Sequence, residues 1–246
     1  MKTSFLWLLC ASPLLASAQS AGPDRFVGEL GGLVATSNAL IHGAESKTTV
    51  LPYVYGDLGR FFARVDTLGF KAMPLGEGHL ELVARVSHEG FKSGKTSHPR
   101  AGDRSAPLPI GLGTFQRTTV GGLFAYAMHD PQSGGQLVEF NWAVQMDIGP
   151  VKLYPQLGWQ YRSADYVQHL YGINAAQSVA TCLCAYRPGA SLTPMATVQA
   201  AVPLNGPWSL QLQTRYRHLD HAIANSPLVN RSSQVSGFAA LTYAVK

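Results

Sequence analysis

Polar and apolar residues alternate along three long segments of the chain. In Trp208–His218 the even positions carry mostly apolar side chains from Trp208 to Tyr216, whereas the odd positions are polar or charged, and residues 137–147 and 152–162 alternate in the same way. Because successive side chains of a strand point to opposite faces, each segment predicts a strand with one apolar and one polar face. The segments have the length of membrane-spanning strands, about 9–11 residues, and aromatic residues at the ends of the apolar face suit the two membrane interfaces. The pattern therefore predicts the lipid-facing staves of a β-barrel.

Ten segments of the chain carry a strand pattern, and most are separated by turn residues. They are Arg25–Ala35, Lys47–Gly56, Arg60–Phe70, His79–His88, Thr114–Met128, Gln136–Ile148, Val151–Arg162, Thr193–Val202, Trp208–His218 and Ser233–Val245. We therefore expect an all-β protein, a transmembrane antiparallel up-and-down β-barrel of about ten strands. The alternative is a barrel of twelve strands, in which Asp165–Tyr171 is one of the further strands.

The N-terminus has the features of an export signal. Lys2 precedes an apolar run from Phe5 to Leu15, and Ala16-Ser17-Ala18 provides a cleavage site of small residues. This pattern predicts a secretory signal peptide at residues 1–18, followed by one barrel domain at residues 19–246. No later run of about 18 apolar residues predicts a transmembrane helix.

Composition supports a barrel more than a soluble or nucleic-acid-binding protein. The net charge of +5 falls to +4 when the signal peptide is removed, and the remaining charges stand singly on alternating strand faces rather than in basic clusters. Charged residues make up only 13% of the chain and the mean hydropathy is +0.03. A soluble sandwich would carry more surface charge, and a soluble lipocalin-like binder would not need aromatic residues at its strand ends.

One long connection is rich in basic residues. In the ten-strand arrangement, Glu89–Gly113 lies on the inner side of the membrane, where bacterial barrels usually have short turns. Its Gly, Ser and Pro content is typical of a loosely packed polar loop. As a functional alternative, its cations form a docking surface for a protein partner, with contacts from Lys92, Lys95, Arg100 and Arg104.

Charges of both signs are expected on the inner face of the staves. The inward-facing set is Arg64, Asp66, Glu81, Arg85, Glu139, Asp147, Lys152, Arg162, Arg215 and Arg217. In so narrow a barrel, side chains fill much of the lumen, so mixed charges favour an interior network of ion pairs. The alternative is that the arginines line a narrow channel for small solutes.

No sequence motif indicates catalysis. Cys182 and Cys184 are too close for an unstrained disulfide and have no neighbouring ligands that complete a metal site. Two Asp–His neighbours, His129-Asp130 and Asp220-His221, occur near strand ends, but adjacency in sequence rarely gives catalytic geometry. We expect no enzymatic activity, cofactor or metal, and no nucleic-acid partner.

Several short segments resemble a known family. They are Leu51-Pro52-Tyr53, Gly59-Arg60-Phe61-Phe62, Tyr166, Leu170-Tyr171-Gly172-Ile173, Asp220 and Asn225-Ser226-Pro227-Leu228-Val229, followed by a final strand that contains glycine. Together they resemble the MipA/OmpV family, the MltA-interacting outer-membrane proteins, along most of the mature chain. The Cys-x-Cys segment and the terminal Lys246 depart from the family pattern.

The resemblance implies a barrel in the outer membrane of a Gram-negative bacterium, in contact with outer-membrane lipid. The family's namesake is a scaffold that brings a lytic transglycosylase together with a murein polymerase, so the resemblance implies a scaffold linking murein-cleaving and murein-synthesising enzymes. A basic segment can contact such enzymes through complementary charge. The sequence leaves the oligomeric state open.

Overall fold

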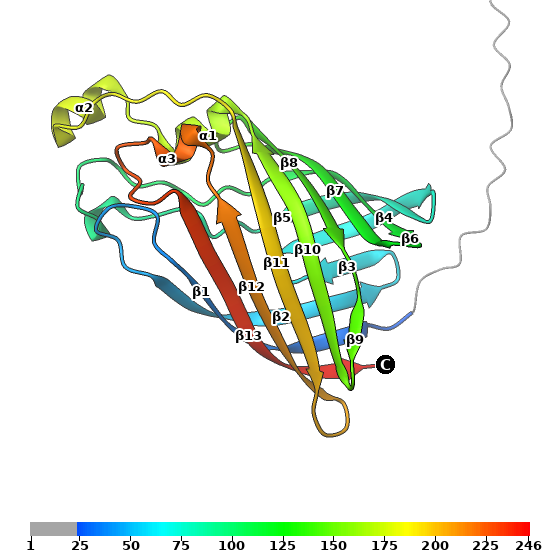
Figure 1. Ribbon diagram of the computed structural model, residues 1–246. Coiled ribbons are helices and arrows are strands. Elements are labelled where there is room, and N and C mark those ends of the chain that lie inside the picture. The colour runs from blue at the N-terminus through cyan, green and yellow to red at the C-terminus, as the bar shows by residue number, and fades with distance from the viewer. Residues whose placement is uncertain (1–23) are drawn as a thin grey trace, which may run out of the picture.

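Strands make up most of the protein. The computed structural model describes residues 24–246, and the predicted signal peptide lies outside them. The strands surround a central axis, with three short helices at one end (Figure 1). The strands are β1 (Val27–Ser37), β2 (Lys47–Leu58), β3 (Phe61–Arg64), β4 (Thr67–Leu75), β5 (Gly78–Arg85), β6 (Ile110–Thr118), β7 (Gly121–Asp130), β8 (Gly135–Ala143), β9 (Met146–Ile148), β10 (Val151–Arg162), β11 (Ser191–Pro203), β12 (Trp208–His218) and β13 (Ser233–Val245).

The strands form one closed antiparallel sheet. Each stave pairs with its neighbours in the chain, and β13 pairs with β1 along Gly28–Ser37, which closes the barrel. The strands β8 and β9 both pair with β10 and are consecutive parts of one stave, so the barrel has twelve staves. The expected antiparallel barrel is confirmed, with the alternative count of twelve rather than the preferred ten.

The two additional staves come from hairpins inside predicted single strands. The segment Arg60–Phe70 folds into β3 and β4, and Thr114–Met128 contains most of β6 and β7. The proposed extra strand at Asp165–Tyr171 is wrong, because these residues lie in helix α1 (Ala164–Tyr171). Ser163 stands at the N-cap position and Asp165 lies in the first turn, where a negative charge favours a helix.

The long connections fold together at one end of the barrel. We call residues 38–46, 86–109, 163–190 and 219–232 the cap. It contains α1, α2 (Ala175–Thr181), α3 (His221–Ala224) and the 3-10 turn η1 (Ser93–Lys95). An Asn174–Gln177 capping box starts α2, and the Asp220 side chain caps α3 by accepting from the Ala222 amide.

The cap shares a hydrophobic core with the barrel mouth. Side chains from all four of its connections are buried there, including Ile41, Ala101, Leu170 and Leu228. The cap segments are also linked by hydrogen bonds, such as that from the Ser226 hydroxyl to the Tyr171 carbonyl at 2.6 Å. The family-like segments around Tyr171 and Ser226 thus pack the cap.

The expected position of Glu89–Gly113 on the inner side is wrong. This segment belongs largely to the cap and lies at the end opposite both described chain ends (Figure 1). The hairpin turn at Val65–Asp66 adds a chain reversal that the ten-strand arrangement does not contain. Every connection between this turn and the β6–β7 hairpin therefore lies at the opposite end of the barrel from the one expected. Because barrel termini face the periplasm, the cap faces the exterior.

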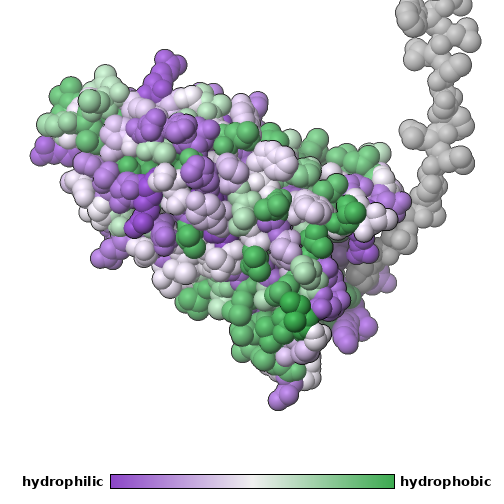
Figure 2. Space-filling view, viewed as in Figure 1, coloured by the Kyte–Doolittle hydropathy of each residue, from purple (hydrophilic) through white to green (hydrophobic). Residues whose placement is uncertain are grey.

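The outer wall is apolar, with aromatic residues near both ends. Trp208 and Tyr243 pack edge to face at the short-turn end, while Tyr161 and Tyr216 are exposed toward the cap. Figure 2 shows hydrophilic side chains gathered over the cap and hydrophobic ones over the lower part of the wall. Between Asp24 and Lys246, no helix is long and apolar enough to cross a bilayer.

Prolines within strands mark interruptions of the hydrogen-bond ladder. Pro52 of β2 and Pro74 of β4 lie beyond the ends of the short strand β3, so neither has a β3 residue beside it. Pro194 of β11 lies beyond the end of the β12 pairing, and Pro155 of β10 faces the break between β8 and β9. Proline has no amide hydrogen, so it is tolerated at such open edges. The prolines therefore do not disrupt the staves that contain them.

Candidate functional site

The six charged residues expected in the lumen all point to the barrel interior. Five of them line one cavity: Arg64 from β3, Arg85 from β5, Glu139 from β8, and Arg215 and Arg217 from β12. The side chain of the sixth, Arg162 of β10, is 2% exposed. Alternation along each strand directs these side chains inward while their neighbours face the lipid.

Two ion pairs within the lumen connect staves that are not adjacent in the sheet. Arg64 donates to both carboxylate oxygens of Glu81, at 2.7 and 2.9 Å, and to the Tyr126 hydroxyl at 2.9 Å. Arg85 donates to Glu139 at 2.8 Å. Glu81 and Glu139 are almost fully buried, and a buried carboxylate is stable only when its charge is paired and its oxygens are hydrogen-bonded. These contacts hold the wall together across the lumen.

A third charged group lies at the mouth of the barrel. Glu89 Oε1 accepts from Arg162 Nη2 and from Arg217 Nη1, each at 2.6 Å. Burial disfavours the charged form of Glu89, but the two guanidinium groups outweigh that effect and lower its pKa to about 2. Glu89 belongs to the cap, whereas the arginines come from β10 and β12 on the opposite wall, so this group fastens the cap across the mouth.

Of the four residues expected to dock a partner, three lie on the surface of the cap and one is half-buried in it. Lys95 and Arg100 are exposed, and Lys92 pairs with Asp103 at 3.1 Å on the surface of the cap. Arg104 instead donates to the Gly172 carbonyl at 2.9 Å and connects two cap segments. Only the first three are therefore accessible as a group.

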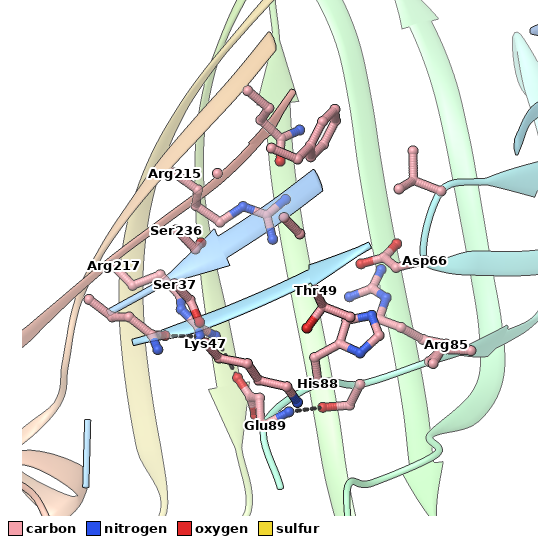
Figure 3. A pocket seen from close by; sticks show the side chains of 18 of the residues that line it. Ser37, Lys47, Thr49, Asp66, Arg85, His88, Glu89, Arg215, Arg217 and Ser236 are labelled. Atoms are coloured by element: carbon pink, nitrogen blue, oxygen red, sulfur yellow. Dashed lines mark hydrogen bonds and ion pairs between the residues drawn. The ribbon is translucent and has the colours of Figure 1, made fainter. Parts of the chain in front are cut away.

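A cavity of about 490 Å³ lies below the cap. One side carries Lys47, Arg215 and Arg217, and Asp66 lies beside Arg85 on another side (Figure 3). The Nε atom of Arg215 donates to the Thr197 hydroxyl at 3.2 Å, and within residues 24–246 Arg215 is paired with no carboxylate. The remaining guanidinium nitrogens are thus available to an anion.

Sequence reasoning missed the polar partners of the lumen charges. Tyr126 and Gln160 hydrogen-bond Arg64 and Glu139, but each residue type is common on a strand and gives no distinct signal. Glu89 did have a signal, because it is one of only two acids in a long basic segment. Its partners on β10 and β12 are far away in the sequence.

The aspartates of the two Asp–His pairs accept hydrogen bonds from backbone amides, and the two cysteines are unpaired. The Asp130 carboxylate accepts from the amides of Leu108 and Ser133, both at 2.8 Å, and Asp220 caps α3. Cys182 and Cys184 are exposed free thiols. No group of three or more potential metal ligands occurs in the described part of the chain.

Comparison with known proteins identifies the family. The family model described as MltA-interacting protein MipA matches residues 30–245. The chain is 23% identical over 229 residues to the putative outer membrane protein YiaT of Escherichia coli (strain K12), covering 91% of each chain. It is 26% identical over 228 residues to the MltA-interacting protein of the same strain, covering 82% of this chain and 92% of the other.

A shorter match links the chain to a further relative. It is 26% identical over 133 residues to the outer membrane protein OmpV of Vibrio cholerae, covering 53% of this chain and 51% of the relative. YiaT and OmpV are named as outer membrane proteins, and the fold described above is a barrel with an apolar outer wall. This chain therefore belongs to the MipA family and is an outer-membrane β-barrel protein.

Proposed function

We propose that this protein is a scaffold of the outer membrane rather than a diffusion pore, and that it binds a lytic transglycosylase and a murein polymerase from its short-turn end. The observation that carries the proposal is the folded cap across the mouth of the barrel. A scaffold needs a rigid barrel with an accessible periplasmic surface, and it needs no open lumen.

The closure of the mouth supports the first half of the proposal. The cap buries side chains such as Tyr166, Leu170 and Ile223 in a common core, and Glu89 joins it to the opposite wall through two charged hydrogen bonds. Opening a path for solutes would expose this core and separate buried charges, both of which are costly.

The relative named MltA-interacting protein supports the lytic-transglycosylase part of the second half, because its name states a partnership with MltA. A partner in the periplasm would contact the short turns of this chain. Val120 in the β6–β7 turn is 64% exposed and Leu204 in the β11–β12 turn is 48% exposed, and Arg117 lies close to Val120. Exposed apolar residues beside a cation are typical of protein contact surfaces.

Capture of purified murein enzymes by the refolded barrel tests this proposal. Val120→Asp should weaken capture of a lytic transglycosylase, because a charge replaces an apolar contact. The matched control replaces Lys92, Lys95 and Arg100 by alanine on the opposite end, and this variant should capture the enzyme as the unchanged protein does. Undiminished capture by Val120→Asp, together with loss of capture by the control, would contradict the proposed surface.

The basic residues predicted to dock a partner lie on the exterior side of the barrel rather than on the periplasmic side. Lys92, Lys95 and Arg100 lie on the cap, and we propose that they contact anionic groups outside the cell. Arg104 connects the cap internally and supports this surface from below.

The second candidate function is a narrow channel for small solutes. The cavity and the unpaired Arg215 favour it over an entirely filled lumen. Planar-bilayer recording separates the two functions. A scaffold should give no reproducible current steps, whereas a channel should give steps that change when Arg215 or Arg217 is replaced.

A further inference from the structure

The barrel wall has a gap on one side, next to β2. This strand pairs with β1 along its whole length, but on its other side β3 pairs only with Tyr55–Leu58. The chain turns at Val65–Asp66, and the Val65 amide donates to the Val54 carbonyl as the last contact between the two strands. In the described structure, residues 47–53 of β2 therefore have no strand on the side that faces β3, which at about 3.3 Å per residue leaves roughly 20 Å of open edge.

Local sequence stabilises this open edge. Pro52 lies within it and lacks an amide hydrogen, so one fewer donor is left unpaired. Val65 has a φ of 56°, a left-handed conformation that is unfavourable for a β-branched residue. Such backbone strain is retained only where the surrounding structure requires it, so the early turn that creates the gap is a built feature of the fold.

The gap lies within the apolar part of the wall. Around it, Val50 is 75% exposed, Leu68 is 56% exposed, and Val86 and Leu108 are each 46% exposed. Irregular backbone and open edges at membrane depth occur where they line a cavity rather than where they contact lipid directly. This gap meets that condition, because Thr49, on the open edge, also lines the cavity below the cap.

The cavity behind the gap is amphiphilic. Its apolar surface includes Leu33, Leu51 and Phe238, which pack together near β1 and β2. Its cationic side carries Lys47 and Arg215 (Figure 3). The other lumen arginines that line it are each bound to a carboxylate, so Arg215 is the guanidinium on β12 that remains for a ligand.

We propose that this cavity binds a single-chain amphiphilic anion, a carboxylate with an alkyl chain, which enters from the outer leaflet through the gap beside β2. The carboxylate binds Arg215, and the alkyl chain lies against Leu33, Leu51 and Phe238 and extends toward Val50. A volume of about 490 Å³ is within the range of small-molecule sites. The proposal is independent of the scaffold function, because it concerns the lumen and not the periplasmic turns.

Photo-crosslinking in lipid vesicles tests this site with the folded, full-length barrel. The probe is a dodecanoate with a diazirine near the chain end, and the matched probe is the corresponding uncharged alcohol. The carboxylate should label residues that border the gap, such as Val50 and Val86, and excess dodecanoate should compete with it. Labelling confined to Val179, on the exposed surface of the cap, would show binding outside the cavity and would overturn the proposal.

Two pairs of variants test the two halves of the site. Arg215→Gln should lower labelling by the carboxylate about tenfold and leave labelling by the alcohol unchanged, since it removes a charged hydrogen bond. Arg187→Gln, which changes an exposed residue of the cap outside the cavity, is its control. Leu51→Trp should abolish labelling by both probes because it fills the cavity, whereas Val198→Trp on the closed wall of β11 should not.

Comparison of unboiled and boiled samples on a gel verifies that each variant is folded before labelling, because a closed barrel changes its mobility when it is unfolded by heating. Equal labelling by both probes with no effect of Arg215→Gln would show ordinary boundary lipid only, and would overturn the proposed anion site. Loss of labelling in Val198→Trp as well as in Leu51→Trp would show that the effect is not specific to the cavity, and would also contradict it.

Discussion

Replacing Glu89 by glutamine removes the carboxylate that joins the cap to Arg162 and Arg217. The variant retains the size of the side chain but loses the charge, so two guanidinium groups face each other without a counter-charge. The Arg162 side chain is 2% exposed and that of Arg217 is 13% exposed, so water cannot solvate them well. We expect the folded barrel to lose stability and the cap to loosen.

The magnitude follows from the pKa of Glu89. Its carboxyl is lowered from 4.5 to about 2 in the folded protein, and each pKa unit corresponds to about 1.4 kcal/mol, which gives about 3 kcal/mol. Measured losses for removing one member of a buried ion pair are about 3–5 kcal/mol, which agrees. Because the folded pKa is depressed, this stabilisation is fully present above about pH 4.5 and is lost as the pH falls toward 2.

Urea unfolding of the barrel refolded in lipid vesicles, followed by tryptophan fluorescence, measures this effect. At pH 7, Glu89→Gln should lower the free energy of unfolding by about 3 kcal/mol, and at pH 3 the difference should fall to roughly half or less. The control Glu77→Gln changes an exposed residue in the β4–β5 turn and should alter stability by less than about 0.5 kcal/mol. A difference that is equally large at both pH values would refute the argument from charge.

Three further substitutions test other parts of the structure. Glu81→Ala leaves a buried arginine unpaired and should cost about 3–5 kcal/mol in the same unfolding assay. Leu228→Ala removes a fully buried side chain from the cap core and should cost about 2–5 kcal/mol, and proteolysis should then cut the cap first. Gly31→Ala would place a Cβ atom 2.0 Å from the Leu241 carbonyl oxygen and should prevent the barrel from closing between β1 and β13, so the gel shift on heating should be lost. Gly32→Ala is the control, because a Cβ atom at Gly32 would lie in open space and the barrel should close normally.

Strand alternation allowed most of the wall to be predicted from the sequence. The predicted ranges Val151–Arg162, Trp208–His218 and Ser233–Val245 agree with β10, β12 and β13 at both ends. Alternation is a local property with a period of two, so a single strand reveals which side chains face inward without knowledge of its neighbours. For the same reason, the positions of Arg162 and Arg215 on the inner face could be predicted.

The hairpins and their consequences could not be predicted in this way. The β3–β4 turn is formed by Val65 and Asp66, and Val65 adopts a positive φ that sequence rules assign to glycine or asparagine. Because valine rather than glycine or asparagine stands at that position, the segment resembles one continuous strand. The missed reversal then moved Glu89–Gly113 to the wrong end, because the side of a connection depends on every reversal before it.

The sequence by itself determined most of the staves, their inner and outer faces and the family. Only the tertiary structure decided the number of reversals, the cap and the gap beside β2, because these depend on pairing between distant segments. Glu89 meets Arg162 and Arg217 across the mouth, and no local pattern records such a contact. The open edge of β2 likewise exists because β3 is short, which is a property of the neighbouring strand and not of β2.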